Sequence, residues 1–179
     1  MNKWLSILLL VFIAACGVVP EEKLAADGKP LPKLYDLATV DAATLQFRML
    51  DAVNALRSGA GLNQLTFNAK LTAAAATHSR DMALQNRPWH FGSDGSSPLD
   101  RVKRVGYEKQ FLGETISETY ESEILTLAAW IEDDATRFIL MDPGATEMGF
   151  SWFQEPNGKI WWTLVTGGPM LSARDVTAG

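Results

Sequence analysis

Hydrophobic residues between positions 41 and 82 recur at intervals of three and four, which predicts amphipathic helices. One such face is formed by Leu45, Met49, Val53 and Leu56. Asp41 can cap this helix, and the stretch 58–61, which holds two glycines, can end it. A second helix, for which Asn68 is the N-cap, presents a face formed by Leu71, Ala75, His78 and Met82. We therefore expect two helices early in the fold.

The turn-rich stretch GSDGSSPLDR, residues 92–101, predicts a turn followed by a helix start. Ser97 can cap a helix that has Pro98 at its first position. Gly106 is expected to stop this helix. We interpret the stretch as chiefly structural, although it begins two residues after one of only two histidines in the chain, His90.

Two further helices are expected after this stretch. The first runs from about Ser122 through Trp130, and a short one follows after Asp134. The apolar face of the first is formed by Ile124, Leu127, Ala128 and Ile131.

The end of the chain changes from helical spacing to aromatic and β-branched runs. Residues 147–153 (EMGFSWF) and 159–165 (KIWWTLV) flank QEPNG, which contains a Pro-Asn-Gly turn. This pattern predicts an antiparallel hairpin. Helices followed by a hairpin indicate an α+β fold in which helices pack on a small antiparallel sheet.

The N-terminus has the pattern of an export signal. Lys3 precedes an apolar run over residues 4–15 that is too short for a membrane span, which needs about 20 residues. The run ends in IAACG, residues 13–17, which resembles the bacterial lipobox, and Cys16 is the only cysteine of the chain. We expect residues 1–15 to be a lipoprotein signal peptide and Cys16 to carry the lipid. The alternative is an ordinary signal peptide whose cysteine is incidental.

The lipid would decide where the protein resides. Each buried methylene contributes about 0.8 kcal/mol, so several acyl chains such as palmitate hold a protein stably on a membrane. Residues 16–40 are expected to be a tether, 41–170 the folded domain and 171–179 a tail. The residue two after the cysteine is Val18 and not the Asp that often retains lipoproteins at the inner membrane. We therefore expect a place in the bacterial cell envelope, on the outer membrane facing the periplasm.

Composition excludes one class of partner. The 179 residues are 47% hydrophobic and 21% charged, typical of one globular domain. Loss of residues 1–15 removes one cation, Lys3, and changes the net charge from -5 to -6. A mildly acidic chain without a basic cluster offers nucleic-acid phosphates no footprint. We expect no nucleic-acid binding, and the sequence makes no prediction of oligomeric state.

Several short motifs together resemble a bacterial CAP domain, of the superfamily of cysteine-rich secretory (SCP-like), antigen 5 and pathogenesis-related proteins. The motifs are HSRDMA (78–83), HFGSDGSSPLDRVKRVGY (90–107), GET (113–115), AWIEDDATRFILMDPGATEMGFSW (129–152) and WWTLV (161–165). The resemblance covers about residues 45–168. It implies an α-β-α sandwich with a cleft lined by two histidines and two acidic residues, which binds a divalent metal in some members.

The resemblance carries over to individual residues only in part. His90 matches the first family histidine, and Glu114 matches the glutamate of the family's GEN motif, here GET. Thr136 stands where the second histidine is expected. Asp133 lies where some relatives carry the second acidic residue. The cleft candidates for ligand binding are therefore His90, Glu114 and Asp133.

This set of residues is poor for catalysis. A zinc site normally needs three or four ligands from His, Cys or carboxylate, and a neutral threonine hydroxyl is a weak one, so we expect no metal and no cofactor. The chain has no G-x-S-x-G motif, and neighbours in HSRD on one helix cannot converge into a triad. His78 is expected to be a packing histidine with a local hydrogen bond. His90 is expected either to contact a ligand or to hydrogen-bond Glu114 and hold the cleft wall.

Three functions remain open at this point. The preferred one is a lipid-anchored, non-catalytic binding module of the bacterial envelope whose cleft or surface engages a lipid, glycan or protein. A purely architectural envelope protein with a vestigial cleft comes second. A metal-dependent or acid–base hydrolase that uses the same cleft comes third.

Overall fold

The structure is a computed structural model that describes residues 35–119 and 121–170. The helices are η1 (Leu37–Thr39, a 3-10 helix), α1 (Ala42–Gly59), α2 (Ala69–Gln85), α3 (Pro98–Arg104), α4 (Glu123–Glu132) and α5 (Asp134–Leu140). The strands are β1 (Thr66–Phe67), β2 (Gln110–Thr119), β3 (Glu147–Gln154) and β4 (Ile160–Gly168). The expected signal peptide, the Cys16 that is expected to carry the lipid, and the expected tail lie outside the described residues.

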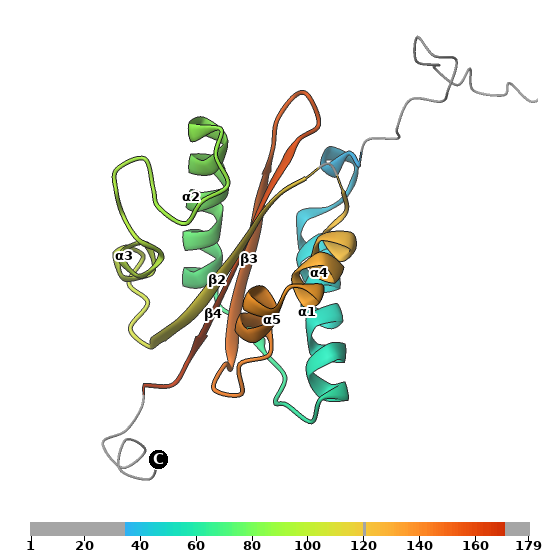
Figure 1. Ribbon diagram of the computed structural model, residues 1–179, viewed down its shortest axis with the longest axis vertical. Helices are drawn as coiled ribbons and strands as arrows, with labels where there is room; N and C mark the ends of the chain where they lie inside the picture. Colours follow the sequence, from blue (N-terminus) through green and yellow to red (C-terminus); the bar gives the residue numbers. More distant parts are fainter. Residues whose placement is uncertain (1–34, 120, 171–179) are drawn as a thin grey trace, which may run out of the picture. The chain divides into compact units, whose positions relative to one another are not determined.

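The strands form one sheet between two layers of helices. Strand order is β1-β3-β4-β2, and β1 runs parallel to β3 while the other neighbours are antiparallel. Helices α2 and α3 cover one face of the sheet, and α1, α4 and α5 cover the other (Figure 1). The α-β-α sandwich is confirmed, but the short parallel strand β1 makes the sheet mixed instead of purely antiparallel.

Helix α1 begins and packs largely as its spacing predicts. The Asp41 side chain accepts a hydrogen bond from the backbone N–H of Thr44, as an N-cap does. Leu45, Met49 and Val53 are buried against the sheet. The fourth predicted position is wrong, because Leu56 is 39% exposed and the neighbouring Arg57 is fully buried.

Arg57 is buried because its guanidinium supplies hydrogen-bond donors to the backbone carbonyl groups around it. Its guanidinium donates to the carbonyl oxygens of Asn63, Leu140, Asp142 and Ala145, at 2.8–3.1 Å. Burial lowers the pKa of Arg57, although the group remains a cation. One side chain thus joins the end of α1 to the loop that follows α5.

Helix α2 has the predicted cap and the predicted face. The Asn68 side chain accepts from the N–H groups of Lys70 and Leu71. The residues on the predicted face, Leu71, Ala75, His78 and Met82, are all fully buried. The helix lies very close to β3, since a Cβ on Gly149 would stand 2.1 Å from the carbonyl carbon of Leu71.

Helix α4 forms where expected but turns a different face to the core. Its buried residues are Glu123, Thr126, Leu127 and Trp130. The predicted face is therefore wrong by about one position, and Ile124 is 43% exposed. Tertiary bonds explain the rotation: Trp130 Nε1 donates to the carbonyl of Ile116, and the Glu123 carboxylate accepts from Tyr35.

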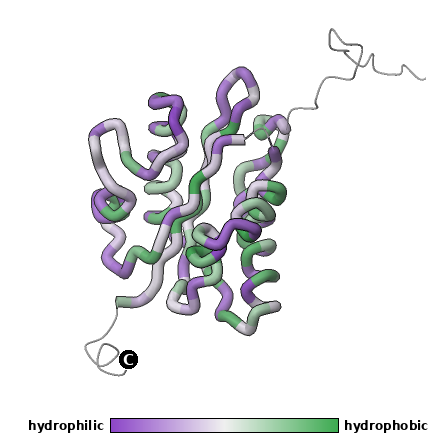
Figure 2. Tube along the Cα trace, in the orientation of Figure 1, coloured by the Kyte–Doolittle hydropathy of each residue, from purple (hydrophilic) through white to green (hydrophobic). Residues whose placement is uncertain are grey.

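The predicted hairpin is formed by β3 and β4, and its polar turn is marked by hydrophilic residues in Figure 2. Strand β4 is buried along its whole length. Phe150 and Trp162 stack across the hairpin with ring centroids 5.5 Å apart. These rings fill the core between the sheet and the layer of α1, α4 and α5.

Residues 35–40, which the sequence assigns to the tether, are packed on this domain. Leu37 is buried in the core, and its N–H donates to the Gln154 side chain. Tyr35 donates through its hydroxyl to Glu123. The packed domain thus begins before residue 41. Within the part of the chain that the structure describes, no helix is both long and apolar enough to cross a membrane.

Candidate functional site

The two matching residues of the predicted cleft, His90 and Glu114, lie side by side. His90 is in the loop between α2 and α3, and Glu114 is in the edge strand β2. A Cβ on Gly113 would touch Ile139 of α5, so Glu114, the next residue in the strand, points to the opposite face, toward α2 and α3. His90 Nδ1 lies 2.9 Å from Glu114 Oε1.

Glu114 is also held by an arginine that the sequence did not single out. Both terminal carboxylate oxygens, Oε1 and Oε2, accept from the same Arg101 nitrogen, at 2.9 and 2.8 Å. The Glu114 side chain is 2% exposed and that of Arg101 is 4% exposed. Arg101 also donates to the backbone carbonyls of His90 and Ser96. The buried pair therefore fixes the loop that carries His90.

The proton positions follow from these partners. An ionised carboxylate only accepts hydrogen bonds, and Glu114 faces a permanent cation, so His90 Nδ1 must be the donor. No described residue hydrogen-bonds His90 Nε2, and the side chain is 49% exposed. The Arg101–Glu114 ion pair that holds His90 is buried, and the Nε2 edge of the His90 ring therefore points outward.

His78 is the second histidine of this cluster. Its Nε2 lies 2.9 Å from the carbonyl oxygen of Trp89 and 3.6 Å from Glu114 Oε1, so Nε2 carries the proton. The ring is fully buried, and its Nδ1 has no partner among the residues described. Burial lowers the pKa of His78 more than the nearby Glu114 raises it. His78 is thus the locally bonded packing histidine that its helical position predicts, and it also lies against Glu114.

The lowered pKa of His78 makes the stability of the protein pH-dependent. Unfolded histidine titrates near pH 6.5, so below that pH the unfolded chain binds a proton that the folded chain rejects. Stability should be complete above pH 6.5 and should fall as the pH drops below it, with a slope of up to about 1.4 kcal/mol per pH unit. The measurement is urea unfolding from pH 8 to pH 5.5, with His78→Gln as comparison.

Since the other groups titrate alike in both proteins, the stability difference between wild type and His78→Gln should shrink toward low pH. A difference that stays constant over this range would show that His78 remains as easily protonated in the folded state as in the unfolded one.

The loop around His90 is held in place by side chains of α2. Asp81 accepts from both the N–H and the hydroxyl of Ser93, and Gln85 accepts from the indole of Trp89. The guanidinium of Arg87 lies 3.9 Å from the centre of a Trp89 ring. These contacts fix the conformation of the loop that carries His90. A hollow of about 340 Å³, lined mostly by polar and charged residues, lies beside the loop between α2 and α3, and Arg101 is one of its lining residues.

The third predicted residue, Asp133, lies at the start of α5. It caps α5 by accepting from the N–H groups of Ala135 and Thr136, which lowers the pKa of its carboxyl group. The Thr136 hydroxyl donates to the carbonyl of Trp130. No hydrogen bond or ion pair described here joins Asp133 or Thr136 to Glu114.

This donor set does not fit the divalent metal that some family members bind. Glu114 is neutralised by Arg101, His78 Nε2 is bonded to the carbonyl of Trp89, and the oxygens of Asp133 and Thr136 hold the start of α5. Within residues 35–119 and 121–170, no three His, Cys, Asp or Glu side chains are grouped to hold a metal ion.

Sequence reasoning missed Arg101 and the contact of His78 with Glu114. The available signal was an arginine beside Val102 in a short capped helix, at a position that turns toward the sheet. Position in a helix can indicate that such an arginine is buried. It cannot identify the carboxylate that it meets, because that carboxylate lies on a strand after the helix.

A three-layer sandwich with a histidine paired to a glutamate of its edge strand is the arrangement that the resemblance to a CAP domain implies. The chain belongs to the CAP, or cysteine-rich secretory protein, family, whose family model matches residues 50–166. The resemblance stated from the sequence motifs is thereby confirmed.

One sequence relative and two solved structures show what this chain is similar to, and the solved structures share its fold. The uncharacterized protein YkwD of Bacillus subtilis is 26% identical over 114 residues, 64% of this chain and 44% of YkwD, so the chain spans less than half of that relative. An outer surface protein of Borrelia burgdorferi is 15% identical with a TM-score of 0.67, covering 73% of this chain and 96% of that one. An extracellular protein of Bacillus anthracis that contains an SCP domain is 20% identical with a TM-score of 0.66, covering 83% of this chain and 45% of that one.

Proposed function

We propose that this protein is a lipid-anchored, non-catalytic binding module of the bacterial cell envelope, in which His90 contacts the ligand. The observation that carries the proposal is that the Glu114 carboxylate is already bonded to its neighbours in the protein. This carboxylate is buried and bonded to Arg101 and His90, so it serves to orient the exposed imidazole. The proposed ligand that contacts this ring is a lipid, a glycan or a protein surface.

Three features argue against catalysis at this site. Glu114 is ion-paired and therefore a poor general base. Ser79, the serine of HSRD, is buried and donates to the carbonyl of Ala75, so it is not presented as a nucleophile. The donor set does not suit a metal, as described above.

The place in the envelope rests on the N-terminal sequence and on the relatives. IAACG at residues 13–17 has the lipobox pattern, and Val18 favours the outer membrane facing the periplasm. The Borrelia burgdorferi neighbour is an outer surface protein and the Bacillus anthracis neighbour is extracellular, which supports an extracytoplasmic place.

The proposal is tested on the full chain expressed in a bacterial host that processes lipoproteins. We expect a mature product that begins at Cys16 with attached acyl chains by intact mass, and that sediments with membranes. Cys16→Ser should leave the membrane fraction. A wild-type product that is secreted without acyl groups would contradict the anchor.

The same purified protein tests the absence of metal chemistry. Zn²⁺ should change the melting temperature by less than about 1 °C, since only a ligand that binds the folded state stabilises it. His90→Ala is the control.

One observation favours the alternative function, a metal-dependent or acid–base hydrolase that uses the same cleft. A histidine that donates through Nδ1 to a buried carboxylate and exposes Nε2 has the arrangement of a catalytic base. This alternative gains support if Zn²⁺ raises the melting temperature of wild type and not of His90→Ala, or if ester hydrolysis is lost in His90→Ala.

A further inference from the structure

The outer edge of β3 has no strand partner over most of its length among the described residues. Strand β1 pairs only with Glu147 and Met148, whereas β3 continues to Gln154. The Met148 carbonyl accepts from Asn68, on the β1 side. The backbone of Glu155 bonds to the β4 side, through Lys159 and Gly158. Alternation then directs the backbone groups of Phe150, Trp152 and Gln154 to the outer edge.

Two of these three residues keep their outer backbone groups unpaired within residues 35–119 and 121–170. The Phe150 carbonyl accepts from the side chain of Gln46. The backbone groups of Trp152 and Gln154 bond to no described residue on that side. An open strand edge of this kind is a template for another extended segment.

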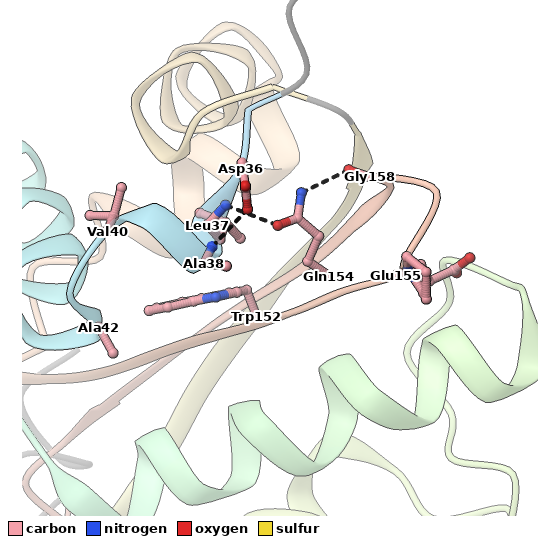
Figure 3. A pocket seen from close by; sticks show the side chains of 10 residues that line it. Asp36, Leu37, Ala38, Val40, Ala42, Trp152, Gln154, Glu155 and Gly158 are labelled. Atoms are coloured by element: carbon pink, nitrogen blue, oxygen red, sulfur yellow. Dashed lines mark hydrogen bonds between the residues drawn. The ribbon is translucent and has the colours of Figure 1, made fainter.

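A groove of about 820 Å³ follows this edge (Figure 3). The half-buried Trp152 indole lies along it, with Leu37, Ala38 and Val40 from the η1 segment as apolar walls. Open backbone groups and an apolar trough therefore lie side by side, as strand addition requires.

The charge at this end of the domain is negative. Asp36 and Glu155 line the groove, and no basic residue does. Lys159, just beyond it, is shared between Glu118 at 3.1 Å and Glu155 at 3.8 Å. Two carboxylates thus share one ammonium group and Asp36 adds a third negative charge to the groove, which favours a basic occupant.

The polar side chains of the groove already make intramolecular hydrogen bonds, which favours a peptide over a sugar. The Gln154 amide donates to the carbonyls of Tyr35 and Gly158 and accepts from the N–H of Leu37. Asp36 accepts from the N–H of Ala38, and Glu155 accepts from the indole of Trp161. A sugar would need such side chains as partners, whereas an added strand uses backbone groups.

We propose that the groove along the outer edge of β3 binds an extended, basic segment of a partner protein by strand addition. The site is separate from the His90 cluster and does not depend on the function proposed for it. The partner's backbone pairs with Trp152 and Gln154, a small apolar side chain rests on the Trp152 indole, and basic side chains face Asp36 and Glu155.

The probe is the palindromic peptide acetyl-Lys-Thr-Val-Thr-Lys-amide, titrated into the full chain by calorimetry. We expect saturable binding, about tenfold weaker for the peptide with Glu in place of Lys. N-methylation of the three central backbone nitrogens should abolish binding, because it removes the strand's donors. Binding that survives N-methylation, or that prefers the acidic peptide, overturns the proposal.

Two variants locate the site. Ala38→Arg adds bulk and positive charge to the groove wall at an exposed position and should weaken binding about tenfold, whereas Ala43→Arg, exposed on α1 outside the groove, should not. Equal effects contradict the assignment. Binding of an N-acetylglucosamine oligomer but not of the peptide would replace it with a glycan site. Peptide binding that appears only in Lys29→Glu/Lys33→Glu would make the chain's own basic segment the occupant.

Discussion

Gly149→Ala should destabilise the folded protein by about 3 kcal/mol or more, which is a large part of the stability of a domain of this size. The added Cβ would stand 2.1 Å from the carbonyl carbon of Leu71 and 2.2 Å from the backbone nitrogen of Thr72. Both atoms belong to the backbone of α2, so no side-chain rotation relieves the clash. The whole helix must move off β3, and the measurement is urea unfolding followed by circular dichroism.

The matched control is Gly59→Ala at the end of α1. A Cβ at Gly59 meets nothing within 4 Å, and alanine is the better helix former by up to about 1 kcal/mol. This variant should keep or slightly raise the stability. Similar losses in both variants would mean that α2 does not approach β3 as closely as described.

Glu114→Leu should cost about 3–5 kcal/mol, because it leaves the buried Arg101 without its counter-charge. Arg101→Met should cost a similar amount by stranding the carboxylate. The double variant should lose clearly less than the sum of the two, since no unpaired charge then remains in the interior. Urea unfolding of wild type, the two single variants and the double variant measures this coupling.

Additive losses in that cycle would show that Arg101 and Glu114 act independently. A second readout concerns the site itself. In the double variant the His90 ring loses its anchor, so its NMR signals should change even if the fold recovers. The cycle thus separates the contribution of the pair to stability from its role in placing His90.

Half of the candidate site could be read from the sequence. His90 and Glu114 were found through motifs, and the structure brings them within hydrogen-bond distance. Position in the motif places Asp133 in the cleft, and the structure shows that its carboxylate caps α5. Arg101 lies within the motif at residues 90–107, but no role follows from that position, because its contact with Glu114 forms only when α3 packs over β2.

Strand β2 shows why some elements had no signal. Its sequence, QFLGETISET, lacks the alternation of a half-buried strand, because Glu114 and Thr115 are buried next to each other on opposite faces. A charged residue at a buried strand position is stable only with a partner, here Arg101. The pattern of the strand alone therefore could not reveal it.

The sequence by itself determined the features that depend on near neighbours. The caps Asp41, Asn68 and Ser97 fixed where three helices begin, since each side chain bonds a backbone N–H two or three residues on. The Pro-Asn-Gly turn likewise depends on near neighbours, since the Asn157 side chain accepts from the N–H of Lys159, two residues on.

Only the tertiary structure decided which side chains at the remaining positions are buried. Arg57 is buried in place of Leu56, because its guanidinium bonds carbonyl groups of a distant segment. Glu123 of α4 is buried, because its carboxylate accepts from the hydroxyl of Tyr35. The same kind of distant bond, from Arg101 to Glu114, built the platform that holds His90. Burying a polar group requires a partner, and the partner is supplied by the fold and not by the local sequence.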